Sequence, residues 1–261
     1  MDANIQEIID RFINNVLGKK ADISSYNPRH DGKAGHWLEV QMGIDPNAYN
    51  DADLFGYEMK NQTNSKTTFG DWSANEYIYK NDDYNISRDD FIEIFGQYNI
   101  AKDRYSWSGK PTPKIDKFNE FGQSLVIDNE KNIIAEYSYS KDKRVDKATI
   151  IPPSMQVDNL EIAKWSSSGN KSLREKVENK FDQKGFFICK KDSNGVYNSI
   201  QFGGTMNFDS FIENVKNGDI YFDSGMYQGN DRPYSQWRAN NTFWNSKITQ
   251  TYPESQYPSK K

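Results

Sequence analysis

Two carboxylates and a lysine lie close together in residues 53–60, in the order Asp53, Glu58 and Lys60. In a β-strand successive side chains point to opposite faces, so Glu58 and Lys60 share a face while Met59 turns into the core. A bend at Gly56 can bring the carboxylate of Asp53 back beside Glu58. The spacing therefore predicts that two carboxylates and one ammonium group converge on one point.

Such a set of groups suits the hydrolysis of a phosphodiester bond. Magnesium accepts oxygen ligands, often one or two carboxylates with waters and phosphate oxygens, and Asp53 and Glu58 are suitable ligands. Lys60 can orient or help to deprotonate the attacking water and stabilise the charged transition state. Glu39, from an expected helix ahead of the strand, can complete the metal shell or accept a water. We therefore expect Mg²⁺ as the cofactor, with Mn²⁺ able to substitute.

Other interpretations of these residues stay open. Glu58 and Lys60 also fit an exposed strand that carries an ordinary i, i+2 ion pair. Asp51 could take the metal role of Asp53. His36, and His30 before it, lie near the site in sequence, and a histidine can be a ligand or a base, although a helix residue beside a cleft is the simpler interpretation of His36.

The hydrophobic pattern predicts helices and strands in a mixed arrangement. Apolar residues recur at helical spacing in some segments and alternate or run together in others. The expected helices are 5–16, 35–42, 91–98, 172–181 and 208–215, and the expected strands are 53–60 with 67–72 beside it, 124–127 with 133–139, 185–189 and 220–222. These elements indicate an α/β (α+β) fold, with a mixed central β-sheet flanked by helices.

Composition excludes several protein classes. The single cysteine, Cys189, rules out a disulfide framework within one chain and fits a reducing cytoplasm, and its apolar surroundings predict a buried strand residue. The N-terminus lacks the basic start and apolar stretch of a secretory signal. No apolar run approaches the ~20 residues of a membrane helix. We expect a cytoplasmic protein with no membrane partner.

Charge is unevenly distributed along the chain. The formal net charge is −4, yet residues 141–191 carry 12 basic and 7 acidic side chains. A solvated helix face or an anionic partner explains this basic segment about equally well. Aromatic residues often stand among polar ones, as at a recognition surface, although a coding bias toward Asn, Lys, Ile and Tyr explains them as well.

The residues around the carboxylates carry a family resemblance. Gly-x-x-Leu-Glu-x-x-x-Gly, from Gly35 to Gly43, is followed by Asp53-x-x-Gly-x-Glu-x-Lys. The chain here resembles the MutH-like branch of the PD-(D/E)xK nucleases, which holds the mismatch-repair nicking enzyme MutH and restriction endonucleases such as MvaI and BcnI. The resemblance implies that Glu39, Asp53, Glu58 and Lys60 form the catalytic site, with the three carboxylates holding metal. It also favours Asp53 over Asp51.

A weaker resemblance, at residues 173–176 and 185–188, is to the later helix and core strand of that family. It implies a nuclease core with a DNA-recognition lobe that forms a cleft. The segment between the two matches is longer than in MutH and looks like an insertion. The expected domains are 1–74, the catalytic core with the metal site; 75–165, a candidate recognition module; 166–252, the rest of the core with a DNA-contacting arm; and 253–261, a frayed tail.

The resemblance implies a type II restriction endonuclease that cuts double-stranded DNA at a short site. It is expected to be a monomer whose cognate DNA methyltransferase is encoded separately. A MutH-type strand-nicking enzyme is the alternative within the class, and a non-catalytic DNA-binding protein is the alternative outside it. A carbohydrate-binding protein rich in Tyr and Trp would leave the Glu-x-Lys arrangement unexplained.

Sequence readout requires side chains that donate in pairs to bases, chiefly Arg, Asn and Gln. Two polar segments that contain aromatic residues meet this requirement, one in the insertion around Trp107 and one at residues 229–238. The expected DNA-binding residues are Arg104, Lys110, Lys114, Arg232, Tyr234 and Arg238. The same arginines could instead contact only phosphates or form surface ion pairs.

Overall fold

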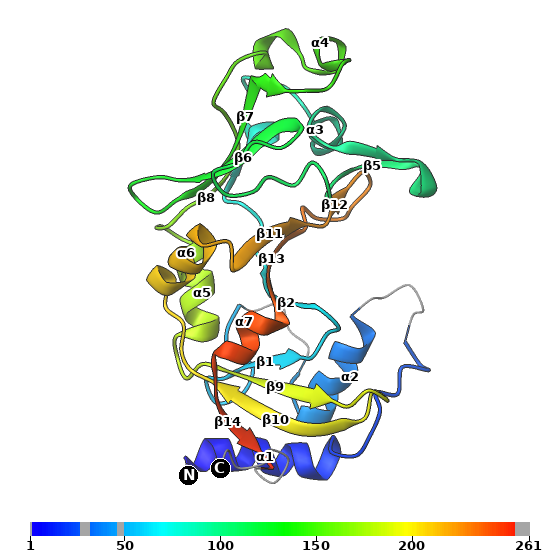
Figure 1. Ribbon diagram of the computed structural model, residues 1–261, viewed down its shortest axis with the longest axis vertical. Helices are drawn as coiled ribbons and strands as arrows, with labels where there is room; N and C mark the ends of the chain where they lie inside the picture. Colours follow the sequence, from blue (N-terminus) through cyan, green and yellow to red (C-terminus); the bar gives the residue numbers. More distant parts are fainter. Residues whose placement is uncertain (1, 27–31, 46–49, 254–261) are drawn as a thin grey trace. The chain divides into compact units, whose positions relative to one another are not determined.

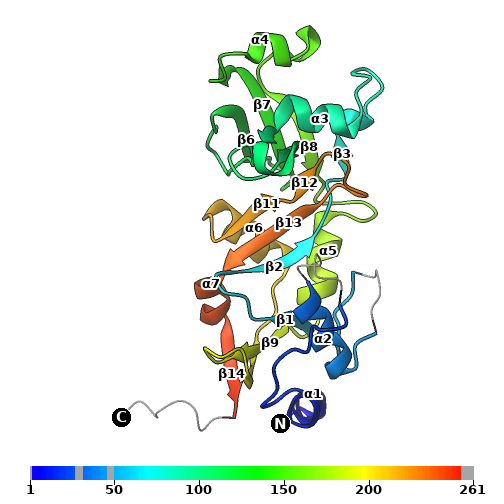
Figure 2. The same cartoon turned by 90° about the vertical axis from the view of Figure 1, so that its right-hand side faces the viewer.

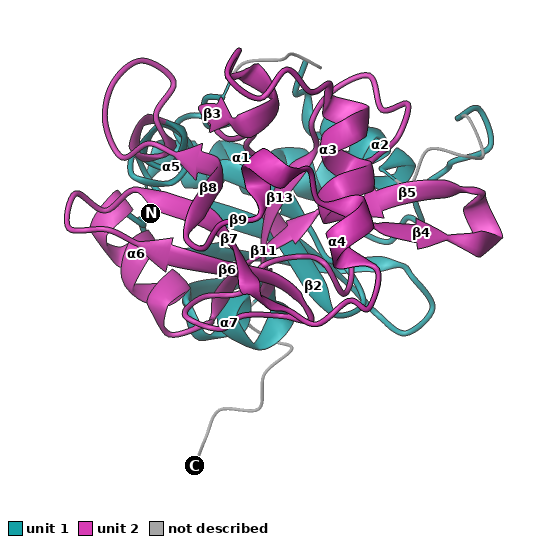
Figure 3. Cartoon of the chain, turned by 90° about the horizontal axis from the view of Figure 1, so that it is seen from above, with its two compact units in different colours: residues 1–67, 176–207, 240–261 teal, residues 68–175, 208–239 magenta. Residues whose placement is uncertain are grey.

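The computed structural model describes residues 2–26, 32–45 and 50–253. The chain divides into two compact units (Figure 3), and each takes several segments of the sequence. Unit 1 holds residues 1–67, 176–207 and 240–261, and unit 2 holds residues 68–175 and 208–239. The expected tail, 253–261, falls mainly outside the described residues.

Unit 1 contains both helices expected near the N-terminus. Helix α1 (Ala3–Asn15) buries Ile8, Ile9 and Phe12 on one side, and the side chain of Asp2 caps it by accepting from Asn4 N at 2.9 Å. Helix α2 (Lys33–Met42) ends at Gly43, whose left-handed conformation (φ 71°) lets its N–H satisfy the last carbonyls. Both sequence predictions are confirmed.

The sheet of unit 1 is mixed, as the sequence predicts. Its strands follow the order β1 (Glu58–Asn61), β9 (Phe186–Lys191), β10 (Tyr197–Gly203) and β14 (Ile248–Tyr252), as Figure 1 shows. Strand β1 runs parallel to β9, and the other pairs are antiparallel. Residues of α1 and α2 pack with Phe187 and Cys189 on one face. On the other face Phe186 contacts Trp244 of α7 (Asn241–Ser246).

The predicted strand 53–60 is shorter in the structure than in the sequence pattern. Only its last residues enter the sheet, because Leu54 and Tyr57 bridge each other across a tight turn. The expected pairing with 67–72 is wrong: β2 (Lys66–Asp71) joins β13 (Ser235–Asn240), and β1 pairs with β9 instead. Hydrophobic alternation fixes which face a strand buries but not which strand lies beside it.

Unit 2 is built from three small sheets. Their strand orders are β11-β13-β2, which Figure 2 shows, β12-β5-β4 and β3-β8-β7-β6. The strands not yet given are β3 (Glu76–Tyr77), β4 (Gln97–Asn99), β5 (Arg104–Trp107), β6 (Phe121–Ile127), β7 (Ile133–Asp142), β8 (Leu160–Trp165), β11 (Ile220–Ser224) and β12 (Met226–Tyr227). The predicted hairpin 124–127 with 133–139 is confirmed as β6 and β7.

The helices of unit 2 lie between these strands. They are α3 (Arg88–Phe95), α4 (Lys147–Ile150) and α6 (Phe208–Lys216), with 3₁₀ turns η1 (Ile78–Lys80), η2 (Ile100–Lys102) and η3 (Pro153–Met155). Helix α5 (Leu173–Phe181) begins in unit 2 and ends in unit 1. The helix predicted at 91–98 begins earlier, at a Ser87–Asp90 capping box, and ends before β4. Segment 75–165 lies wholly in unit 2, together with 208–239.

Aromatic side chains form much of the core of unit 2. The indole of Trp107 is fully buried against Phe91 and Phe222, and its N–H donates to Gln123 Oε1 at 2.6 Å. The sequence placed Trp107 in a segment that contacts DNA, and that interpretation is wrong for its side chain. An aromatic residue in a polar sequence neighbourhood can still point inward, because alternate strand residues face the core.

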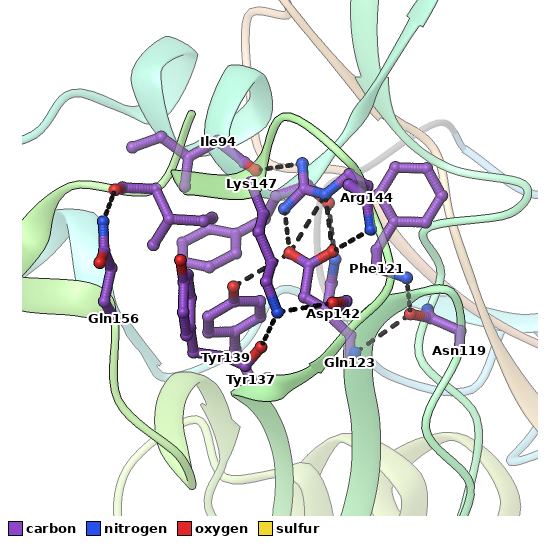
Figure 4. Close-up of polar contacts among 12 residues, drawn as sticks. Ile94, Asn119, Phe121, Gln123, Tyr137, Tyr139, Asp142, Arg144, Lys147 and Gln156 are labelled. Atoms are coloured by element: carbon purple, nitrogen blue, oxygen red, sulfur yellow. Dashed lines mark hydrogen bonds and ion pairs between the residues drawn. The ribbon is translucent and has the colours of Figure 1, made fainter. Parts of the chain in front are cut away.

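A buried charge network ties α4 to the sheet of unit 2 (Figure 4). The carboxylate of Asp142 accepts from the hydroxyl of Tyr137 at 3.0 Å and from the guanidinium of Arg144 at 2.7 Å. Arg144 also donates to the Ile94 carbonyl, and the Lys147 ammonium donates to Tyr139 O at 2.7 Å. Buried charges are retained only when paired in this way. Two cations of the basic segment therefore serve the fold itself.

No helix in the described part of the chain is both long and apolar enough to span a membrane.

Candidate active site

Strand β1 presents the Glu-x-Lys pair at the edge of the unit 1 sheet. Glu58 opens the strand beside Phe186 of β9, and its N–H donates to Gly185 O at 3.0 Å. Its side chain is only 3% exposed, while Met59 turns to the opposite, apolar face. The alternation predicted from the sequence is therefore observed, and Glu58 is not the exposed strand residue of the alternative interpretation.

A two-residue turn returns Asp53 to the start of β1. Leu54 and Tyr57 exchange backbone hydrogen bonds of 3.0 and 2.8 Å, and the turn residues Phe55 and Gly56 have positive φ angles of 52° and 87°. Glycine takes such angles without strain. The carboxylate of Asp53 then accepts from the Met59 N–H at 2.8 Å. The bend expected at Gly56 therefore brings Asp53 back to the start of β1, next to Glu58.

Lys60 lies on the same face as Glu58. Its Nζ stands 2.8 Å from Glu58 Oε1 and 5.3 Å from the centre of the Phe181 ring. Burial lowers the pKa of the Lys60 ammonium group, and the charge of Glu58 acts in the opposite direction. A desolvated lysine held by a carboxylate is well placed to interact with an anionic substrate.

A second lysine completes the site and was not found from the sequence. Lys180, in the last turn of α5, places Nζ 3.0 Å from Glu58 Oε1 and 3.2 Å from Oε2. It stands just before Phe181, the ring that packs on Lys60. The sequence shows only that Lys180 lies next to the apolar residues of a predicted helix. It does not show that this helix ends beside β1.

The two carboxylates influence each other. Burial, and after it the charge of Glu58, raise the pKa of Asp53 to about 6, against the lowering effect of Lys180 and of the Met59 N–H. A like charge beside a buried carboxyl disfavours its ionised form, and a cation at the pair would reverse that effect. The pair therefore has the oxygen-donor chemistry that suits a hard divalent metal.

Glu39 is not shown beside this pair. It is half-buried in α2, and the described residues contain no group of three or more His, Cys, Asp or Glu side chains that could hold a metal. His36, in the same helix, contacts the ring of Tyr26 edge-on at 5.4 Å between centroids. Asp51 is exposed, in contrast to Asp53. His30 falls outside the described residues.

The residues expected to bind DNA all lie in unit 2. Arg232 pairs with Asp71 at 2.9 Å and lies over the ring of Tyr234, and Arg238 pairs with Asp223 at 3.2 Å. Arg104 stacks on the ring of Tyr227. Lys110 and Lys114 are exposed. The arginines thus have partners within the protein, which agrees with the alternative interpretation that they form surface ion pairs. To contact DNA they must exchange these partners or share them with the DNA.

Comparison with known proteins identifies the family. The model of the LlaMI restriction endonuclease family matches residues 16–252, which include every site residue named above. The chain belongs to the LlaMI restriction endonuclease family. A curated relative, the type II restriction enzyme ScrFI of Lactococcus lactis subsp. cremoris, is 49% identical over 95% of this chain and 98% of its own length.

A solved structure shares the fold. The restriction endonuclease MvaI in a complex with cognate DNA superposes with a TM-score of 0.61, over 96% of this chain and 98% of the other, at 14% identity. Membership of the LlaMI family confirms the interpretation as a type II restriction endonuclease, a site-specific DNA-cleaving enzyme. Neither the MutH-type nicking enzyme nor the non-catalytic DNA-binding protein is favoured.

Proposed function

We propose that this restriction endonuclease hydrolyses its DNA phosphodiester at the site formed by Asp53, Glu58, Lys60 and Lys180, with a divalent metal. The supporting observation is a pair of neighbouring carboxylates: Glu58 is 3% exposed, and partial burial together with the charge of Glu58 raises the pKa of Asp53. A partly buried Asp53 beside a second carboxylate costs stability in its ionised form, so a functional reason for keeping it is expected.

The metal would be held by Asp53 and Glu58, with Glu39 as a third carboxylate, and we propose Mg²⁺, with Mn²⁺ able to substitute. When bound, such an ion makes water a better nucleophile at neutral pH and relieves charge on the phosphate oxygens. One oxygen of Asp53 accepts from the Met59 N–H, and this bond fixes the orientation of its carboxylate.

The two lysines have different tasks at Glu58. Lys60 extends from the strand and donates to Glu58 Oε1, and its ammonium group is proposed to orient the attacking water or to contact the phosphate. Lys180 spans both oxygens of Glu58 and balances the charge of this carboxylate when no metal is bound. Both cations also compensate the negative charge that a phosphate adds to the site.

Partners and location follow from the same proposal. The substrate is double-stranded DNA, and unit 2, with Arg104, Lys110, Lys114, Arg232, Tyr234 and Arg238, is proposed to contact it. We propose that the enzyme acts as a monomer in the cytoplasm and that a separately encoded DNA methyltransferase protects the host sites.

The direct test is digestion of unmethylated phage DNA with purified enzyme, followed by mapping of the ends. We expect discrete fragments with Mg²⁺ or Mn²⁺ and none with EDTA. Ca²⁺ should support binding without cleavage. Discrete cleavage that persists after exhaustive chelation would contradict the metal mechanism while leaving the family assignment intact.

Glu39→Gln tests the third carboxylate. If Glu39 holds the metal or a metal-bound water, its loss should lower the cleavage rate by roughly 10²-fold or more, because one ligand interaction is lost. Rates are measured in single turnover with saturating enzyme, so that binding does not limit them. Near-normal turnover would make Glu39 a helix-surface carboxylate with no catalytic role.

A further inference from the structure

The strands β4 and β5 form a ribbon, residues 97–107, with an apolar side chain at its tip. Ile100 is 87% exposed there, and Tyr98 is 43% exposed. In Figure 3 this ribbon extends away from the other elements of unit 2. A single exposed aliphatic residue is common on protein surfaces and needs no explanation by itself. The bonds that fix Ile100 in one position at the tip of the 97–107 ribbon do require an explanation.

Local bonds make the tip of the 97–107 ribbon rigid. The side chain of Asn99 accepts from the Lys102 N–H at 3.2 Å, which fixes the 3₁₀ turn that contains Ile100. Tyr98 and Tyr105 lie opposite each other with ring centroids 5.1 Å apart, and the Tyr98 hydroxyl donates to Asp103. The exposed aliphatic side chain is therefore presented in one position, at low cost in conformational entropy on binding.

The base of the 97–107 ribbon is anchored in unit 2. The Tyr105 N–H donates to Gln228 Oε1 at 2.9 Å, and the guanidinium of Arg104 lies 3.2 Å from the centre of the Tyr227 ring. Gly96 joins α3 to β4 where a Cβ would come within 2.3 Å of the Ile92 carbonyl. These contacts fix the direction in which the ribbon leaves the unit.

We propose that the 97–107 ribbon enters the major groove of the DNA substrate and that Ile100 packs there against the base edges. That groove is about 12 Å wide and admits a two-stranded β-ribbon, and its floor carries one apolar group, the thymine 5-methyl. Lys102, an exposed residue of the same turn, supplies positive charge toward the phosphates. Ile100 is then a specificity-determining residue.

This inference rests on DNA being the substrate and not on the metal site. Binding is therefore measured with Ca²⁺ and again with EDTA, on the duplex defined by the mapped ends and on an unrelated duplex. Ile100→Ala should weaken binding to the site duplex by roughly 5- to 30-fold, because it loses apolar contact area. Binding to the unrelated duplex should be weakened far less. If the metal mechanism fails, this comparison still stands.

Two further variants separate base contact from charge. Ile100→Lys places a cation at the tip and would match or exceed wild-type affinity if the tip only touched phosphates. We expect it to bind the site duplex as poorly as Ile100→Ala. Val157→Ala is the matched control, since Val157 is also exposed (45%) in unit 2 but stands beside the acidic Asp158. Wild-type affinity of Ile100→Ala, or an equal loss on both duplexes, would overturn the inference.

Cross-linking locates the contact on the DNA. Ile100→Cys can carry a photoactivatable label without interference, because Cys189 is fully buried and burial raises the pKa of its thiol. We expect cross-links to bases within or beside the site and none from labelled Val157→Cys. Bound enzyme should also protect the nearby guanine N7, in the major groove, from dimethyl sulfate. Protection of adenine N3 alone would place the tip in the minor groove and contradict the inference.

Discussion

Asp53→Asn is expected to lower the cleavage rate by at least about 10³-fold while DNA binding survives, because it removes a charged oxygen ligand from the metal site. Asparagine keeps an oxygen that can accept the Met59 N–H, so the turn before β1 should be preserved. Glu58→Gln should have a similar effect on cleavage. Wild-type rates in both variants would show that the carboxylates are not catalytic.

The same substitution should stabilise the metal-free protein. The pKa of Asp53 is raised to about 6 by burial and by Glu58, so the folded state binds its proton more tightly than the unfolded state, where the pKa is near its ordinary value. The ionised carboxylate therefore costs stability above about pH 6, and the cost disappears as the pH falls below about 4. At pH 8 Asp53→Asn should raise the free energy of unfolding by roughly 1–3 kcal/mol.

Denaturant unfolding in EDTA at pH 8 and pH 4 measures this difference. Asp51→Asn is the matched control, since Asp51 lies two residues away and is exposed. It should change neither stability nor cleavage. An Asp53→Asn protein that is less stable than wild type at pH 8 would mean that the carboxylate is satisfied without a metal, against the charge argument.

The sequence predicted the parts of the site that lie within one turn of chain. The period-2 alternation placed Glu58 and Lys60 on one face, and the glycine at 56 predicted the bend that returns Asp53. The helix end at Gly43 was found for the same reason, since a left-handed C-terminal residue is a local requirement. Cys189 was correctly placed in a buried strand.

The features of the site that could not be predicted depend on strand pairing between segments far apart in the sequence. The partner of β1 is β9, more than a hundred residues away, and that pairing brings the end of α5 and Lys180 to Glu58. No local period encodes it. Trp107 was misplaced for a related reason: the sheet that buries its face is completed by β12, from residues 226–227. Family resemblance supplied roles for Glu39 and its partners, but not this second lysine.

Lys60→Ala and Lys180→Ala should separate the two cations at Glu58. Lys60→Ala is expected to lower the single-turnover rate by roughly 10²- to 10⁴-fold, the usual range for a lost acid–base or charge-stabilising group. An ammonium group is not a metal ligand, so calorimetry with Ca²⁺ in the presence of DNA should give a metal affinity close to that of wild type. Complete loss of metal binding would contradict this role for Lys60.

Lys180→Ala should act mainly through Glu58. The carboxylate keeps Lys60 but loses the cation that spans both oxygens, which should cost roughly 1–3 kcal/mol of metal-free stability, because a buried charge is left less well paired. A metal no longer competes with Lys180 for Glu58, so the Mg²⁺ concentration for half-maximal cleavage should fall even as the maximal rate falls. Lys184→Ala, which removes a partly exposed lysine paired with Asp2, is the control and should change neither the stability nor the Mg²⁺ requirement. A Lys180→Ala enzyme that needs more Mg²⁺ than wild type would instead show that Lys180 orients Glu58 for the metal and does not compete with it.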